Sequence, residues 1–259
     1  RMGHLPAVVG PVEAAVVARG GQAARAHAEP LLEVSPVGHV AVEGGLDADA
    51  PGVALAVDAP AAHLAADVDD VVPPAELLDQ QEGYEALADM YEGLKQMDAL
   101  LPAAREKVNA ELGARFAELC QQHKFFYILG SGPNFSQTYA MAICSLMEMQ
   151  WQHCSYIHSA EYFHGPFEAT QDGVFYFLQM GSSECRAMDE RALAFLKTHT
   201  DTLMVLDAKE YGMEAVPASV RAYLDPVLFY AMNCELRAAR GKVFDHDPDF
   251  RRYMGVVEY

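Results

Sequence analysis

The feature that most constrains this fold is an apolar run that breaks into a glycine-rich turn. Phe125–Leu129 contains no charge, and the turn Gly130-Ser131-Gly132-Pro133-Asn134 follows it directly. This pattern is typical of a buried parallel strand that leads into a helix. Residues 139–151 are then almost entirely apolar, and Glu148 carries their only charge. We therefore expect a strand, a turn and a helix that is covered on most of its sides.

Three further apolar runs, residues 154–157, 174–180 and 202–206, have the length of strands. Residues 186–199 have helical periodicity and separate the last two runs. Strands that alternate with helices imply right-handed crossovers and a parallel sheet covered on both faces. The sequence therefore predicts the α/β class, with a doubly wound parallel sheet in a three-layer sandwich.

Helices are also expected on either side of this region. Apolar residues between Tyr84 and Met97 recur at helical spacing, and we expect Leu101-Pro102 to end that helix before a second one over 103–123. After the last strand we expect irregular chain over 217–225. A closing helix over 226–240 should then be stopped by Gly241.

The first eighty residues differ in composition from the rest of the chain. They contain no Phe, Tyr, Trp, Ile, Asn, Lys, Thr or Cys, and a core without aromatic residues or Ile is hard to pack densely. We expect residues 1–81 to be an extension of low order, or a segment foreign to the rest of the chain. Residues 82–259 are expected to form the folded domain.

Charge and cysteine content limit the possible partners. The formal net charge of −19 argues against nucleic acid and anionic membranes, although backbone N–H groups could still bind a phosphorylated substrate. No uninterrupted apolar run is long enough to span a membrane. The five cysteines include no CxxC pair, which favours reduced thiols and a cytoplasmic location.

Glu148 and His164 are the candidate catalytic pair. A carboxylate and an imidazole can move protons between carbon and oxygen atoms, and burial makes a carboxyl group a better proton shuttle near neutral pH. The Gly165-Pro166 turn would hold His164 at a fixed angle. Their sixteen-residue spacing is not helical, so the fold must bring them together. The alternatives are a carboxylate bonded to backbone or Arg, and a core or capping histidine.

A metal site is not expected. Four potential ligands lie close in the sequence, but neither an HExxH motif nor a cysteine pair fixes their geometry. These four residues are His153, His158, Glu161 and His164.

Several segments together resemble a known family. They are, in chain order, GSGPN, AICSLMEMQW, IHSAEYFHGPFE, DERALAFLK, VLDAKEYG and RRYMGVVEY. They look like the second sugar isomerase (SIS) domain of the fructoselysine 6-phosphate deglycases, and more distantly like the isomerase half of glucosamine-fructose-6-phosphate aminotransferase. The resemblance covers roughly residues 82–259 and implies a flavodoxin-like sandwich. It does not extend to residues 1–81, where a deglycase would carry its first SIS domain.

The resemblance also implies roles for individual residues. Glu148 would be the base that moves a proton between C1 and C2 of an open-chain sugar phosphate. His164 would assist ring opening and serve the site of the neighbouring subunit in a homodimer. Ser131 and Asn134 are secondary candidates for substrate binding, because this loop would shape the site more than it grips phosphate. Neither a redox cofactor nor a metal would be needed.

The C-terminal tail separates two groups within the family. The aminotransferase carries a catalytic lysine shortly before its end, whereas this chain has no lysine after Lys242. This difference argues against amide transfer and favours the deglycases. The tail would fold over the sugar site, where Arg251, Arg252 and Tyr253 are candidates for contact with a substrate phosphate or carboxylate.

The resemblance favours cleavage of a 6-phosphorylated Amadori product, such as fructoselysine 6-phosphate, into glucose 6-phosphate and an amine. One alternative is an aldose-ketose isomerase or aminosugar-phosphate enzyme that uses the same proton shuttle. The other is a sugar-phosphate-binding protein or fragment without catalytic activity. We expect little turnover from this chain assayed alone, because it lacks a recognisable first SIS domain.

Overall fold

The computed structural model describes residues 72–258. The prediction for residues 1–81 therefore falls largely outside the described residues, and residues 72–81 form most of helix α2. The main elements are α2 (Val72–Glu82), α3 (Leu87–Val108), α4 (Ala114–Gln122), β1 (Phe125–Gly130), α5 (Phe135–Ala140), β2 (His153–His158), β3 (Phe175–Met180), α6 (Arg186–His199), β4 (Leu203–Asp207) and α7 (Arg221–Phe244). Two π-helical segments, η1 (Asn109–Gly113) and η3 (Met141–Glu148), continue α3 and α5, respectively. Short 3-10 turns are η2 (Gly132–Asn134), η4 (Tyr162–His164), η5 (Pro166–Ala169), η6 (Ala208–Tyr211) and η7 (Met213–Ala215).

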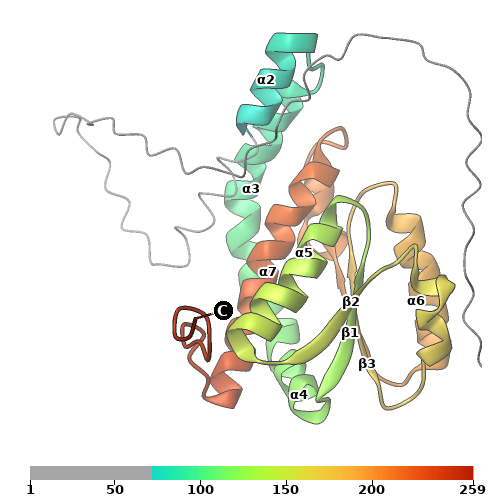
Figure 1. Cartoon of the computed structure of the whole chain (residues 1–259). Coiled ribbons are helices and arrows are strands. Elements are labelled where there is room, and N and C mark those ends of the chain that lie inside the picture. The colour runs from blue at the N-terminus through green and yellow to red at the C-terminus, as the bar shows by residue number, and fades with distance from the viewer. Residues whose placement is uncertain (1–71, 259) are drawn as a thin grey trace, which may run out of the picture. The chain divides into compact units, whose positions relative to one another are not determined.

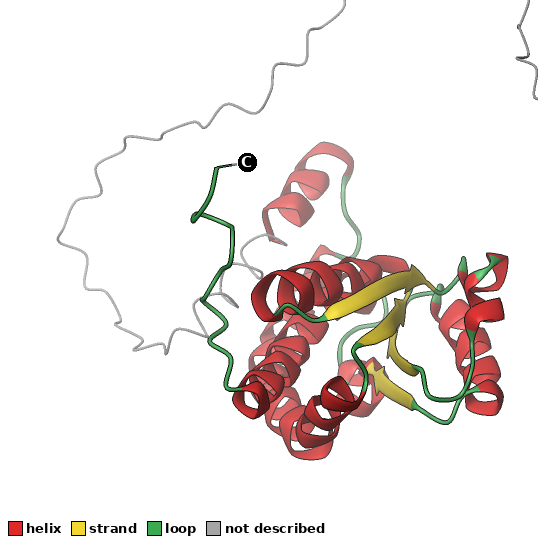
Figure 2. Cartoon of the chain, turned by 60° about the horizontal axis from the view of Figure 1, so that its bottom comes forward, coloured by secondary structure: helices red, strands yellow, loops and turns green. Residues whose placement is uncertain are grey.

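The four described strands form a parallel sheet in the order β2-β1-β3-β4. In its register Phe126 lies opposite Cys154 on one side and Phe175 on the other. All four strands predicted from apolar runs are present. Figures 1 and 2 show helices on both faces of the sheet, so the predicted doubly wound α/β sandwich is confirmed.

Alternation along the strands divides the core into two layers. On one face, Phe126, Ile128 and Phe177 are fully buried and pack with α3, α4 and α7. On the other face, Leu129 and Leu178 pack with α6. Because successive strand residues point to opposite faces, a strand that is apolar at every position must be covered on both sides.

The prediction that Pro102 ends a helix is wrong. Helix α3 continues through Pro102 to Val108, and η1 and α4 extend the helical run to Gln122. Pro102 is exposed, as is Asp98 one turn earlier, so water can solvate the carbonyl group that loses its N–H partner. Neighbouring turns of α3 are anchored by buried Leu101 and Ala104, and this packing outweighs the local preference of proline.

The predicted boundaries of the last helix are also wrong. Helix α7 begins at Arg221, inside the stretch expected to be irregular, and continues past Gly241 to Phe244. Gly241 is buried, and a Cβ atom there would lie 3.3 Å from the Gln150 Nε2 atom and 3.4 Å from the His246 carbonyl oxygen. Glycine therefore permits a close approach at this position, and the helix ends instead at Asp245, which has left-handed backbone angles.

The helix over residues 135–148 is less covered than its sequence predicts. Tyr139 is 44% exposed and Cys144 is exposed, while Ile143 is half-buried. An almost uncharged helix thus presents an apolar surface on one side. Among the described residues, no helix is long and apolar enough to cross a membrane.

Candidate active site

Glu148 lies at the end of η3, beside a cavity of about 520 Å³. One wall of the cavity is formed by Met147, Glu148, Trp151, Gln152 and His153, and the other by residues 251–254. The Glu148 side chain is 33% exposed, so it lies on a side of the helix that the protein covers only in part. The position gives a small molecule access to this carboxylate.

The opposite wall is the beginning of the C-terminal tail, which we define as residues 246–258. After α7 ends, the chain turns back towards the end of η3, where His246 Nε2 lies 2.7 Å from the Met149 carbonyl oxygen. Arg251 Nε then donates to Glu148 Oε1 at 3.3 Å. The fold thus brings four predicted site residues to one cavity: Glu148, Arg251, Arg252 and Tyr253.

The ion pair between Glu148 and Arg251 is partly open to solvent. The two side chains are 33% and 20% exposed, respectively, and a pair of this kind stabilises a protein by about 1 kcal/mol or less. A bound phosphate or carboxylate group could therefore attract Arg251 away from Glu148 at small cost. Release of Arg251 would leave Glu148 free to accept a proton.

His164 lies elsewhere in the subunit. It ends the short turn η4, its side chain is exposed, and its ring makes no hydrogen bond with a described residue. Gly165 follows with a φ angle of 150°, which residues with a Cβ atom rarely adopt, so the predicted constrained turn is present. Glu148 precedes the amino end of β2 and His164 follows its carboxyl end. Because a six-residue strand is about 16 Å long, one subunit does not bring them together.

Ser131 and Asn134 are also remote from the Glu148 cavity. Both are buried in the turn after β1, at the carboxyl edge of the sheet. Ser131 Oγ donates to the Cys185 carbonyl oxygen at 3.0 Å and so joins this turn to the one after β3. The Asn134 amide has no hydrogen-bond partner among the described residues. In this structure Ser131 shapes the sheet edge, and its hydroxyl group is not exposed to a ligand.

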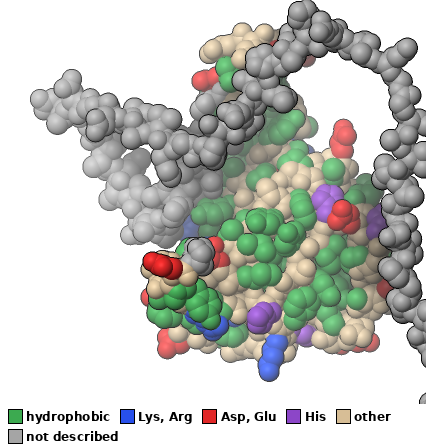
Figure 3. Space-filling model, in the orientation of Figure 1, with side chains coloured by type: hydrophobic (Ala, Val, Ile, Leu, Met, Phe, Trp, Pro, Cys, Tyr) green, Lys and Arg blue, Asp and Glu red, His purple; other side chains and the backbone are tan. Residues whose placement is uncertain are grey.

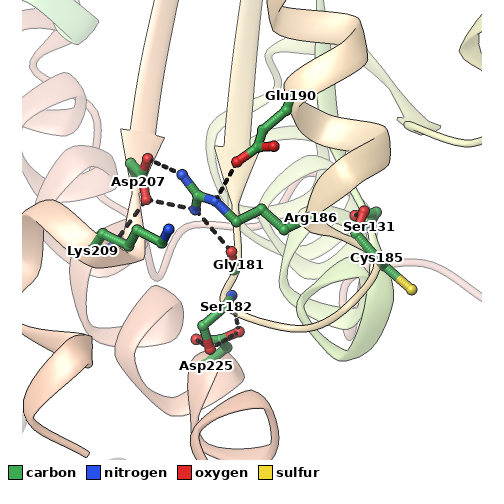
Figure 4. Close-up of polar contacts among 9 residues, drawn as sticks. All are labelled: Ser131, Gly181, Ser182, Cys185, Arg186, Glu190, Asp207, Lys209 and Asp225. Atoms are coloured by element: carbon green, nitrogen blue, oxygen red, sulfur yellow. Dashed lines mark hydrogen bonds and ion pairs between the residues drawn. The ribbon is translucent and has the colours of Figure 1, made fainter. Parts of the chain in front are cut away.

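A polar network that the sequence analysis missed crosses the same edge (Figure 4). Arg186 forms a two-point contact with Asp207, with N–O distances of 2.8 and 2.6 Å, and also donates to the Gly181 carbonyl oxygen. Asp225 accepts from both the backbone N–H and the hydroxyl of Ser182. The Asp225 carboxylate therefore already accepts from the hydrogen-bond donors of Ser182, in the loop after β3. A phosphate group would find these donors occupied, which makes this edge a poor phosphate site. The available sequence signal was Asp207 at the carboxyl end of β4 and Arg186 at the start of the helix that follows the neighbouring strand β3.

Two aspartates at this edge are unusually weak acids. Burial raises the pKa of Asp189 to about 6, although the Ser159 and Ser131 hydroxyls nearby favour its charged form. Neither Asp189 oxygen is in hydrogen-bonding geometry with a described residue. Burial likewise raises the pKa of Asp225 to about 6, against the hydrogen bonds from Ser182.

The domain should consequently lose stability between pH 4 and pH 7. Below the unfolded-state pKa of 3.8, Asp189 is neutral in both states, and as pH rises through 6 the folded state must bury a charge that the unfolded state exposes. Asp189→Asn should therefore raise the free energy of unfolding at pH 7 by roughly 2 kcal/mol, but not at pH 4. Urea titrations at both pH values test this, with the exposed Asp172→Asn as control. Equal effects of Asp189→Asn at both pH values would contradict the assignment.

Metal ligands do not cluster in the described part of the chain. No group of three His, Cys, Asp or Glu side chains in residues 72–258 could hold a metal ion. The five cysteines are all unpaired. Cys120 and Cys154 are buried, whereas Cys144 and Cys185 are exposed.

Known proteins with similar sequences and structures include deglycases and phosphosugar isomerases. The chain is 39% identical over 171 residues to the fructosamine deglycase FrlB of Bacillus subtilis, and 35% identical over 150 residues to the fructoselysine 6-phosphate deglycase of Escherichia coli. A solved Bacillus subtilis structure described as a phosphosugar isomerase superposes with a TM-score of 0.67 at 35% identity. These similarities support the assignment of the matched region to the sugar isomerase (SIS) family.

The coverage limits what these similarities say about activity. The SIS match to FrlB covers 65% of this chain and 51% of FrlB, and the match to the Escherichia coli enzyme covers 58% and 43%, respectively. The Bacillus structure match covers 70% of this chain and 55% of the other. A Salmonella typhimurium structure of the same description gives a TM-score of 0.68 at 33% identity, covering 71% and 57%. The chain thus spans about half the length of the curated relatives it matches. No protein-family model matches it.

Proposed function

We propose that this SIS domain supplies the proton-transfer residues of a deglycase that cleaves a 6-phosphorylated Amadori product, such as fructoselysine 6-phosphate, into glucose 6-phosphate and an amine. The main support is the cavity in which Glu148 faces Arg251, Arg252 and Tyr253. The similarity to fructosamine and fructoselysine 6-phosphate deglycases indicates the substrate class.

The proposed chemistry needs one base and one group that assists ring opening. His164 transfers a proton at the ring oxygen and gives the open-chain ketone. Glu148 removes a proton from C1, next to the substrate nitrogen, and the C2 oxygen takes a proton from solvent, which gives an enaminol. Return of that proton to C2 gives an imine, and water hydrolyses the imine to the aldehyde of glucose 6-phosphate and the free amine. Arg251 and Arg252 are positioned to attract the substrate's phosphate or carboxylate.

We further propose that two copies of the chain share each site. Glu148 and His164 lie at opposite ends of β2, so a two-fold axis near the middle of this strand would place the partner subunit's His164 near Glu148. The surface between them is apolar, with exposed Tyr139 and Cys144 and half-buried Tyr156. Figure 3 shows hydrophobic side chains gathered on the face that carries α5. In a chain with net charge −19, such an uncharged surface is where two copies can approach with least repulsion.

An assay of two products tests this function. The relatives are about twice as long as the matched region, so the assay compares the chain alone with a chimera in which residues 82–259 replace the matching part of FrlB. We expect the chimera to release lysine from fructoselysine 6-phosphate, and the chain alone to release little or none. A chimera that interconverts hexose phosphates without releasing an amine would indicate an isomerase. A folded chimera that does neither would contradict both functions.

A further inference from the structure

Trp151 has an unusual backbone conformation next to the proposed site. Its φ angle is 53°, and Asp245 is the only other non-glycine residue in the described part of the chain with positive φ. This left-handed conformation brings Cβ close to the following carbonyl group, so a helix normally ends here with Gly or Asn. A bulky aromatic residue at such a position suggests a function for the side chain.

A buried guanidinium fixes the two residues that flank Trp151. Arg240 donates to Gln150 Oε1 at 3.0 Å and to Gln152 Oε1 at 2.9 Å. Arg240 is only 4% exposed and forms no ion pair with a described residue. A buried cation whose hydrogen-bond acceptors are two neutral amides is costly in free energy. The two hydrogen bonds hold Gln150 and Gln152, the residues on either side of Trp151, in place. This clamp accounts for the persistence of the strained turn.

The Trp151 ring contacts three residues of the C-terminal tail. Its centroid lies 4.6 Å from the His246 ring and 5.6 Å from the Phe250 ring, and the Arg252 guanidinium lies 3.7 Å above it. Arg251 is located between two of these contacts in the sequence and is the residue that reaches Glu148. Ring contacts of this kind each stabilise a docked segment modestly, and several on one side chain add up.

We propose that Trp151 is a positioning residue that docks the C-terminal tail and thereby holds Arg251 at Glu148. The docked tail forms the second wall of the cavity, and its release exposes the Glu148 carboxylate further. Any effect of docking on catalysis rests on the proposed role of Glu148 as the base, but the docking of the tail on Trp151 does not. Docking can therefore be measured on the intact chain without any turnover.

Limited trypsin digestion tests the docking, because Arg251 and Arg252 are cleavage sites within the tail. Trp151→Gly removes the ring while keeping the left-handed backbone easy to adopt. We expect cleavage after these arginines to be at least about tenfold faster in this variant, from the loss of three ring contacts. The unfolding midpoint should change little, because relief of backbone strain offsets the lost contacts.

Two further variants separate docking by the ring from other causes. Trp151→Phe restores an aromatic face and should return cleavage close to the wild-type rate. Glu148→Gln removes only the weak ion pair and should accelerate cleavage by about fivefold or less. Unchanged cleavage in Trp151→Gly, failure of Trp151→Phe to restore protection, or a larger effect of Glu148→Gln than of Trp151→Gly would each overturn the proposal.

Trp151 also gives the docked state a spectroscopic signal, because it is the only tryptophan in the chain. Arg252→Met removes the cation above the ring, and we expect red-shifted emission and faster quenching by acrylamide as the tail leaves. Val256→Ala serves as the control, because Val256 belongs to the tail, is 66% exposed and does not line the Glu148 cavity. Identical emission and quenching in wild type and Arg252→Met would count against docking on Trp151. If docking is confirmed but the chimera releases no amine, only the proposed function fails.

Discussion

Glu148→Gln should reduce amine release by the chimera about 10²–10⁴-fold, which is the usual contribution of a positioned general base. The amide has nearly the same shape and still fits the cavity beside Arg251, but it cannot accept the substrate proton. The effect should appear in kcat more than in KM, because the lost interaction forms during proton transfer. Steady-state rates of lysine release from fructoselysine 6-phosphate measure it.

Glu106→Gln is the matched control for this substitution. Glu106 is an exposed carboxylate of α3 outside the Glu148 cavity, so its amide variant should keep the wild-type rate. Thermal unfolding of both variants should match the parent protein, since neither substitution removes a strong contact. A Glu148→Gln chimera that retains most of the parent's kcat would show that another group takes the proton.

The sheet could be predicted because its strands carry their own signal. Phe125–Leu129 carries no charge, residues 174–180 are apolar apart from Gln179, and a strand buried on both faces needs such a pattern. Helix ends were harder to predict. Pro102 and Gly241 are local signals for a helix end, but Pro102 faces solvent and Gly241 allows close packing, so tertiary contacts decided both cases.

The candidate site could be predicted in part. Glu148 stands out as the one charge in an apolar helix, and Arg251 and Arg252 were found through the resemblance of the tail. The clamp between Arg240 and the glutamines beside Trp151 gave no signal, because it joins residues about 90 positions apart through side chains of ordinary types. The sequence also contained no sign of the left-handed backbone at Trp151, because that conformation is expected at Gly or Asn and not at a bulky aromatic residue.

The role of His164 depends on an arrangement that a single subunit does not contain. Its exposed position and its distance from Glu148 along β2 agree with service to the site of another copy. The central claim is therefore that Glu148 and the partner subunit's His164 form one site.

Mixing two inactive variants tests this claim most directly. Chimeras carrying either Glu148→Gln or His164→Gln are each expected to be inactive, and equal amounts are unfolded and refolded together to exchange subunits. If the site is shared, each mixed dimer regains one site with both residues intact, and the mixture should recover about a quarter of the parent's rate of amine release. A mixture that stays inactive although mixed dimers form would contradict the shared site.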